Sequence, residues 1–291
     1  MFHNLTDGAK GAWCMIVGTL LLTSQDAISK WMTTNYHAGE ILFYRGIFTF
    51  IPIAILVAWS GNLSLLSTKS LASTLTRAVL GTATSIFVVL SFVNLPLATA
   101  LAIIFLSPIM LTALSSPILG EQVGWRRWLA VFVGFGGVLL IIQPGSGDKW
   151  LYFLIPLFTA LLSTFRDIVT RQMKGGDSSV SILFYSMVVE LAAGTVSLPL
   201  FGAQWPSLPD LGLFAAAGTM IGISHLLMIQ ALLFAPGGTL APFKYLSLVY
   251  AAGIGYVIWG DVPNGWKIAG ATLVVGAGLF ILHREMRAST T

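Results

Sequence analysis

Apolar stretches long enough to cross a lipid bilayer follow one another along almost the whole chain. A transmembrane helix needs about 20 consecutive apolar residues. Clusters of turn residues, such as 60–62 and 263–265, separate the stretches. Because the stretches are helix-length and do not alternate in polarity, they predict helices and not the strands of a membrane barrel. The sequence predicts ten transmembrane helices, at about 11–32, 38–59, 71–93, 97–119, 125–142, 150–173, 180–201, 211–234, 239–259 and 266–282.

The charge content excludes a soluble protein. Only 9% of the 291 residues are charged and 56% are hydrophobic, whereas about 25% are charged in soluble domains. The net charge of +4 reflects scarce acids and not a basic stripe, so no nucleic-acid partner is expected. Lys and Arg favour one side of the predicted bundle, nine against three, which places both termini in the cytoplasm.

Signatures of enzymes and metal sites are missing from the sequence. It contains no Walker A loop, no H-E-x-x-H and no G-x-S-x-G. The four histidines are too scattered to form a metal site, and the single cysteine, Cys14, allows no intramolecular disulfide. We therefore expect no metal, no cofactor and no enzymatic activity.

An internal repeat divides the chain into two halves. A shift of 140 or 141 residues brings similar segments onto one another in the same order, and each half contains five predicted helices. The matches are Asp26 with Asp167, Lys30 with Arg171, 41–44 with 182–185, 106–107 with 246–247, 120–121 with 260–261 and 124–126 with 265–267. Because five is odd, the second half enters the membrane from the opposite side. The sequence predicts an inverted repeat, 10–143 and 150–286, with a substrate site near the midplane.

The repeat and its motifs resemble the drug/metabolite transporter superfamily, in its EamA-like branch. The resemblance covers about residues 10–286 and includes the half-ending Gly120-Glu121 and Gly260-Asp261, together with Lys30 and Arg45. It implies ten helices, cytoplasmic termini in a bacterial inner membrane, and movement of small metabolites without ATP. Within that branch the chain is most similar in type to the amino-acid exporters, including the aromatic type. One departure is that Ser186, and not an arginine, stands opposite Arg45 in the second half.

Charged residues inside the predicted spans are candidates for function, because each is costly in lipid unless it is paired or hydrated. Asp26 and Lys30 lie one helical turn apart, as do Asp167 and Arg171. Each couple predicts either a structural salt bridge or one of two gates on opposite faces of the membrane. Arg45 lies about 10 Å deep by helical rise, where Asp26 or Glu40 is its expected partner.

Three ionisable groups lie deeper: Glu190, His225 and Lys244. An ammonium here would bind a carboxylate, and a buried carboxylate would bind an amine or a proton. The alternative is structural, with Glu190 paired to Lys244 or His225 between helices.

Prolines and small polar residues mark places in a helix where backbone groups become available to bind a substrate. Pro108 follows Ser107 in the fourth predicted helix, and Ser247 in the ninth aligns with Ser107, with Pro242 one turn earlier. Broken helices at corresponding positions of two repeats point to a transporter site. The candidate walls of that site are Tyr44, Tyr185 and Tyr245.

We therefore expect a secondary transporter that exports small metabolites, amino acids first, by alternating access around a midplane site containing Lys244. Another metabolite class, such as a vitamin, a nucleotide precursor or a drug-like molecule, would fit the same scaffold. A membrane-bound enzyme or sensor would need a catalytic cluster or a soluble domain, which the sequence lacks. Proton coupling and passive facilitation both fit, as do a monomer and a weak homodimer.

Overall fold

The computed structural model of the chain describes residues 6–120, 124–143, 148–173, 178–235 and 237–289. Within these ranges every regular element is a helix. The helices are α1 (Asp7–Met32), α2 (Ala38–Ser60), α3 (Leu71–Asn94), α4 (Leu97–Ile104), α5 (Ser107–Leu119), α6 (Trp125–Ile142), α7 (Leu154–Gln172), α8 (Ser179–Phe201), α9 (Leu208–Phe234), α10 (Gly237–Lys244), α11 (Leu246–Trp259) and α12 (Gly265–Ser289), with short 3-10 turns at Leu63–Leu66 and Asp148–Phe153.

The described ranges contain nine helices long and apolar enough to cross a membrane, counting α4 with α5 as one span over 97–118. The pair α10 and α11 stands where the sequence predicts the remaining span. All ten predicted segments are therefore helical, and most of their ends lie within a few residues of the predicted ones.

Two of the predicted helices are broken. The fourth is divided between α4 and α5 around Phe105, and the ninth between α10 and α11 at Tyr245. Pro108 causes the first break, because a proline nitrogen cannot donate to the carbonyl group of Ile104. The two breaks lie at equivalent positions of the repeat, since 105 and 245 differ by the shift of 140.

The same capping device ends the last helix of each broken pair. Gly120 follows α5 and Gly260 follows α11, with φ of 70° and 68° respectively. Glycine adopts this left-handed conformation without the steric cost of a side chain, so it ends a helix where the chain must turn. The neighbouring Glu121 lies outside the described residues.

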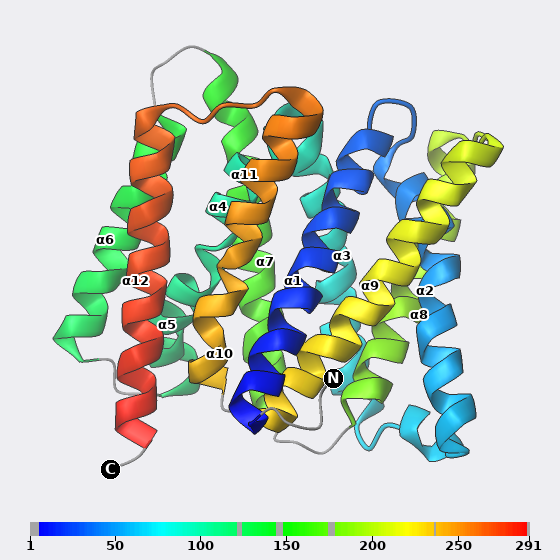
Figure 1. Cartoon of the computed structure of the whole chain (residues 1–291), viewed down its shortest axis with the longest axis horizontal. Coiled ribbons are helices and arrows are strands. Elements are labelled where there is room, and N and C mark those ends of the chain that lie inside the picture. Colours follow the sequence, from blue (N-terminus) through cyan, green and yellow to red (C-terminus); the bar gives the residue numbers. More distant parts are fainter. Residues whose placement is uncertain (1–5, 121–123, 144–147, 174–177, 236, 290–291) are drawn as a thin grey trace.

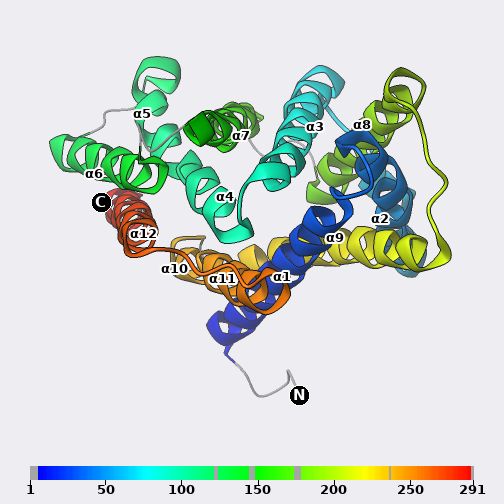
Figure 2. The ribbon, with the colours of Figure 1, turned by 90° about the horizontal axis from the view of Figure 1, so that it is seen from above.

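The helices run side by side between two ends of the molecule (Figure 1). The start of α1 and the end of α12 lie at the same end, which we call the terminal side, and the other end is the far side. From above, α6 and α12 pack together at one edge, while α2, α8 and α9 lie at the opposite edge (Figure 2). Between them stand α1, α3, α4, α7, α10 and α11.

Helix packing is alike in the two predicted halves. α1 packs along α9 as α7 packs along α3, and α2 packs on α9 as α8 packs on α3. Close approach of α6 and α12 depends on glycine, because a Cβ atom at Gly137 would lie 2.7 Å from the carbonyl oxygen of Gly270. A Cβ atom at Gly134 would likewise meet Ile109 and Ala277, whereas one at Gly136 or Gly276 would have no atom within 4 Å.

Candidate functional site

A buried polar layer lies toward the far side and joins four helices. Arg45 on α2 is 4% exposed, and its Nη2 donates to Oε1 of Glu190 on α8 at 2.8 Å. Its Nη1 donates to Ser29 Oγ at 3.0 Å and to Gln25 Oε1 at 3.3 Å, both on α1. Ser85 on α3 donates to the other oxygen of Glu190 at 3.2 Å. We call Gln25, Asp26, Ser29, Arg45, Ser85 and Glu190 the buried layer.

These contacts change the expected partners. Glu190 forms its ion pair with Arg45, so the predicted pairing of Glu190 with Lys244 or His225 is wrong, as is the pairing of Arg45 with Glu40. Asp26 also forms no ion pair with Arg45, although the charge of Arg45 acts on its carboxylate. The charges of Arg45 on α2 and Glu190 on α8 neutralise each other. The two residues are far apart in the sequence, so this pairing could not be predicted from their spacing.

Asp26 and Lys30 do not form the predicted salt bridge, although the structure describes both. Asp26 accepts a hydrogen bond from the neighbouring Gln25 amide. Lys30 Nζ donates to the carbonyl oxygens of Phe92 and Leu95 at 3.0 and 2.7 Å and lies 5.3 Å from the ring centre of Trp259. The physical reason is that carbonyl groups at the end of α3 lack partners within the helix and attract the ammonium group.

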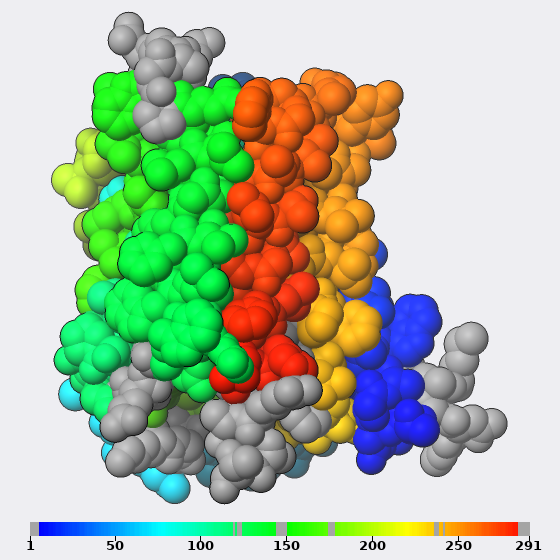
Figure 3. Space-filling view, turned by 90° about the vertical axis from the view of Figure 1, so that its left-hand side faces the viewer, coloured from blue at the N-terminus to red at the C-terminus, as the bar shows by residue number. Residues whose placement is uncertain are grey.

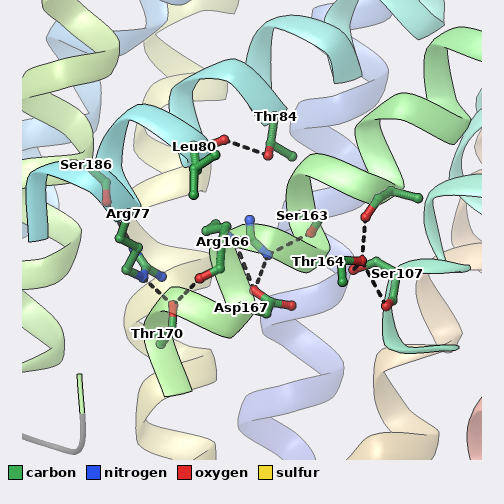
Figure 4. A network of polar contacts seen from close by, with 11 residues as sticks. Arg77, Leu80, Thr84, Ser107, Ser163, Thr164, Arg166, Asp167, Thr170 and Ser186 are labelled. Carbon is green, nitrogen blue, oxygen red and sulfur yellow. Dashed lines mark hydrogen bonds and ion pairs between the residues drawn. The ribbon is translucent and has the colours of Figure 1, made fainter. Parts of the chain in front are cut away.

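A second polar layer lies toward the terminal side and is partly exposed, and Figure 4 shows its contacts from close by. Arg166 Nε and Nη2 donate to Oδ1 of Asp167 at 3.0 and 2.9 Å, and the two side chains are 30% and 38% exposed. Arg77 reaches from α3 to Thr170 Oγ1 at 2.8 Å and to Ser186 Oγ at 3.1 Å. We call Arg77, Arg166, Asp167, Thr170 and Lys244 the accessible layer.

Lys244, on α10, is the remaining member of the accessible layer. It is exposed and is the last residue of α10, directly before the break at Tyr245. The charges of Asp167 and Arg166 both act on it. His225 on α9 is held by its own helix, with Nδ1 2.9 Å from the carbonyl oxygen of Ile221, and the charges of Arg77, Arg166 and Glu190 act on the ring.

Two arginines have contacts that the sequence did not reveal. Arg77 counts among the nine basic residues of the predicted inner side, and nothing in the sequence distinguished Arg166. Asp167 pairs with Arg166, the preceding residue, whereas the predicted partner was Arg171. The repeat could have indicated the pairing of Arg166 with Asp167, because Arg166-Asp167 aligns with Gln25-Asp26. In both couples the first side chain donates to Oδ1 of the second.

The equivalence extends to the arginines. Ser29 and Thr170 differ by 141 residues, and each accepts a hydrogen bond from a guanidinium group of another helix. Arg45 on α2 supplies the first and Arg77 on α3 the second. Ser186, which replaces an arginine opposite Arg45, accepts from Arg77. Arg77, which belongs to the first half of the chain, therefore brings a guanidinium group to Ser186, where the sequence alignment of the repeat shows no arginine.

Small polar candidates lie beside the two helix breaks. Thr164 Oγ1 donates to the carbonyl oxygen of Ser107 at 3.2 Å (Figure 4). Ser247 Oγ donates to the carbonyl oxygen of Lys244 at 2.7 Å. The hydroxyl groups of Thr164 and Ser247 thus satisfy backbone carbonyl groups at the two breaks, and Pro108 lies in the first turn of α5, after the first break.

Two of the three candidate tyrosines pack in the interior. Tyr245 is 7% exposed, lies against Gly278 of α12, and its hydroxyl has no hydrogen-bond partner among the described residues. Tyr44 is also 7% exposed, and its hydroxyl donates to the carbonyl oxygen of Gln204 at 2.7 Å. Tyr185 is half-buried with its ring edge against Phe184.

Hydrogen bonds at the far side join the α1–α2 connection and the start of α2 to the start of α9 and the segment before it. Tyr36 donates to Asp210 at 2.9 Å, and burial, with this hydrogen bond, raises the pKa of Tyr36. The backbone nitrogen of Gln204 donates to Glu40, which is 1% exposed, at 2.7 Å. Together with the contacts of His37 with Gly202 and of Tyr44 with Gln204, these form what we call the far-side clamp.

The part of the chain that the structure describes holds no group of three His, Cys, Asp or Glu side chains that could bind a metal ion.

Comparison with known proteins relates the chain to a family of transporters. Residues 9–143 match the model of the EamA-like transporter family, so the chain is similar to that family over this segment. The chain is a multi-pass protein of the bacterial inner membrane, and proteins of the EamA-like family are transporters of small metabolites.

Relatives of known function cover almost the whole chain. The S-adenosylmethionine uptake transporter of Rickettsia bellii is 29% identical over 91% of each chain. The riboflavin transporter of Rhizobium johnstonii is 26% identical over 95% of this chain and 92% of its own. The pseudopaline exporter of Pseudomonas aeruginosa is 25% identical over 92% of this chain and 94% of its own.

A solved crystal structure aligns with a TM-score of 0.66 at 17% identity, over 95% of this chain and 99% of the other. At this identity the likeness establishes the fold alone.

Proposed function

We propose that the chain is a secondary transporter that moves a small, carboxylate-bearing metabolite by alternating access. The observation that carries this proposal is the charge of the accessible layer. Arg77, Arg166 and Lys244 supply three cations against the single acid Asp167. In a low-dielectric setting such an excess of cations is costly until an anionic group joins it, and guanidinium and ammonium groups bind carboxylates through charge-assisted hydrogen bonds.

The architecture we propose is ten spans in two inverted repeats, 10–143 and 150–286, with α10 and α11 as the broken ninth span. Its support is the matched helix breaks, the matched packing of α1 on α9 and α7 on α3, and the matched contacts of the two layers. The excess of Lys and Arg toward the terminal side favours a cytoplasmic location of both termini.

The two polar layers suggest how access alternates. In this conformation the side chains of Arg45 and Glu190, in the buried layer, are 5% and 11% exposed. The side chains of Arg166 and Asp167, in the accessible layer, are 30% and 38% exposed. We propose that substrate enters from the terminal side, that the accessible layer then closes on it, and that the buried layer opens in exchange. Asp26 and Asp167, which are repeat equivalents, mark the two gates.

The relatives guide the choice of substrate. Those named above carry S-adenosylmethionine, riboflavin or pseudopaline, and no amino-acid exporter is among them. We therefore propose a metabolite other than a simple amino acid, with S-adenosylmethionine as the first to test. Because the named relatives include an importer and an exporter, export by this chain stays a prediction.

A flux assay in proteoliposomes of the purified protein tests the proposal. Uptake of radiolabelled S-adenosylmethionine is measured first, and a panel of unlabelled riboflavin, amino acids and their methyl esters then competes with it. We expect inhibition by molecules with a free carboxylate and much weaker inhibition by the matching esters. Equal inhibition by acids and esters would show that the accessible layer does not bind a carboxylate.

Variants test whether transport depends on the accessible layer. Lys244→Ala and Arg166→Gln should each reduce transport of a carboxylate substrate by about tenfold or more, the equivalent of one charge-assisted hydrogen bond. Lys244→Arg should retain more activity, and Lys267→Ala, at the far end of α12, serves as the control. Wild-type flux in Lys244→Ala would exclude its role in carboxylate binding.

A further inference from the structure

A hollow of about 190 Å³ lies at the terminal side, between the start of α6 and the end of α12. Its lining consists of Gly124, Trp125, Arg126 and Arg127 from the start of α6, and Arg284 from α12. It lies at the edge of the molecule, away from the two polar layers. We call it the arginine hollow.

The charges of the arginine hollow have no counter-charge in the described parts of the chain. Three guanidinium groups line it, no acid does, and none of the three forms an ion pair or a hydrogen bond with a described residue. The one contact of this kind is a cation–π contact, with Arg126 5.4 Å from the ring centre of Trp125.

The placement of two of these arginines is electrostatically unfavourable. Arg126 and Arg127 lie in the first turn of α6, which contains no acidic residue. The start of a helix carries a partial positive charge, so cations there are disfavoured and an anion is favoured. Arg284 adds a third positive charge from another helix. An anion with several oxygen atoms would relieve all three.

The surface beside the hollow is apolar. α6 and α12 lie next to each other down this face of the molecule (Figure 3). Trp125 is 71% exposed at the edge of the hollow, as tryptophan commonly is at the level of lipid headgroups. Large apolar side chains continue from it along the outer surface of the two helices: Leu129, Phe132, Leu139, Leu273 and Phe280.

We infer that the arginine hollow binds the phosphate headgroup of an anionic phospholipid, whose acyl chains lie along α6 and α12. A free phosphate would satisfy the three guanidinium groups but would make no use of the apolar surface that leads to them. Basic pockets between transmembrane helices on the cytoplasmic side are suited to anionic headgroups. The inference does not depend on the substrate of the transporter.

Native mass spectrometry of the purified full-length protein in detergent tests this inference. We expect phosphatidylglycerol to bind well above phosphatidylcholine with the same acyl chains. Near the surface one arginine contributes roughly fivefold to binding of an anionic lipid, so the triple variant R126Q/R127Q/R284Q should bind phosphatidylglycerol on the order of 100-fold more weakly. The matched control K267Q, at the other end of α12, should bind like the wild type.

Three outcomes would overturn the inference. The first is equal binding of phosphatidylglycerol by the triple variant and the wild type. The second is equal binding of both lipids by the wild type. The third is thermal stabilisation of the wild type by inorganic phosphate to the same degree as by phosphatidylglycerol, since the acyl chains would then be irrelevant. Single variants R126Q and R284Q, each expected to weaken binding several-fold, keep the test valid should the triple variant fold poorly.

Discussion

The ring of Phe105 lies 5.1 Å from the ring of Tyr245, centre to centre. The two residues are equivalents in the repeat, and each stands at a helix break, one between α4 and α5 and the other between α10 and α11. The contact therefore brings the two helix breaks together, next to Lys244 in the sequence. In the two-fold arrangement that we propose, equivalent residues touch only near the axis, so this contact would lie there.

Tyr245→Phe should leave transport unchanged and the midpoint of thermal unfolding unchanged or slightly raised. The hydroxyl of Tyr245 is buried without a partner among the described residues, and an unsatisfied buried polar group destabilises a protein by about 1–3 kcal/mol. Tyr245→Ala removes the ring contact with Phe105 and should lower the midpoint. A rise in the KM for substrate with Tyr245→Phe would instead indicate that the hydroxyl contacts substrate.

Glu190→Gln should destabilise the protein by about 3 kcal/mol, because it leaves the guanidinium group of Arg45 buried without its carboxylate. Thermal unfolding in detergent measures the effect. The matched control is Asp7→Asn, which breaks the exposed pair of Asp7 with Lys10 and should cost less than about 0.5 kcal/mol. Similar losses in the two variants would mean that the Arg45–Glu190 pair does not stabilise the contact of α2 with α8.

Gly137→Ala should separate α6 from α12, because the added methyl group would meet the backbone oxygen of Gly270 at 2.7 Å. Backbone cannot move aside as a flexible side chain does, so we expect a lower unfolding midpoint. Gly136→Ala, one residue earlier and with no atom within 4 Å of the new carbon, is the control and should be tolerated. Loss of stability in the control alone would contradict the observed packing.

Single cysteines at the equivalent positions Ser29 and Thr170 should label at different rates. In a Cys14→Ser background, a membrane-impermeant thiol reagent should modify Thr170→Cys readily and Ser29→Cys slowly, since Ser29 is 1% exposed and Thr170 is half-buried beside the exposed Asp167. Conditions that reverse the conformation should reverse this order. Equal labelling under all conditions would contradict alternating burial of the two layers.

Much of the fold follows from the sequence, because lipid imposes a simple rule. Each span must be apolar over its whole length, so Trp125 and Ile142 could be predicted as the ends of α6. The break at Phe105 could be predicted from Pro108, because a proline removes one backbone hydrogen bond from a helix. Predictions of this kind depend on neighbours in the sequence and need no knowledge of packing.

The polar contacts were harder to predict, because they join helices far apart in the chain. Arg45 and Glu190 are 145 residues apart, and Arg77 and Thr170 are 93 apart. Helical spacing instead suggested Asp26 with Lys30, a pair that the carbonyl groups at the end of α3 break up. Which of several partners a side chain binds depends on how whole helices pack. The spacing of residues within one helix does not determine that packing.

The far-side clamp has a kinetic consequence for the proposed transport cycle. To open the far side, the protein must break the hydrogen bond of Tyr36 with the start of α9 and those of Glu40 and Tyr44 with the segment before it. An empty transporter has no bound ligand to offset that cost, so its return step should limit net flux. Loading both sides of a vesicle with substrate avoids the empty return, and one-for-one exchange should then run faster than movement into empty vesicles.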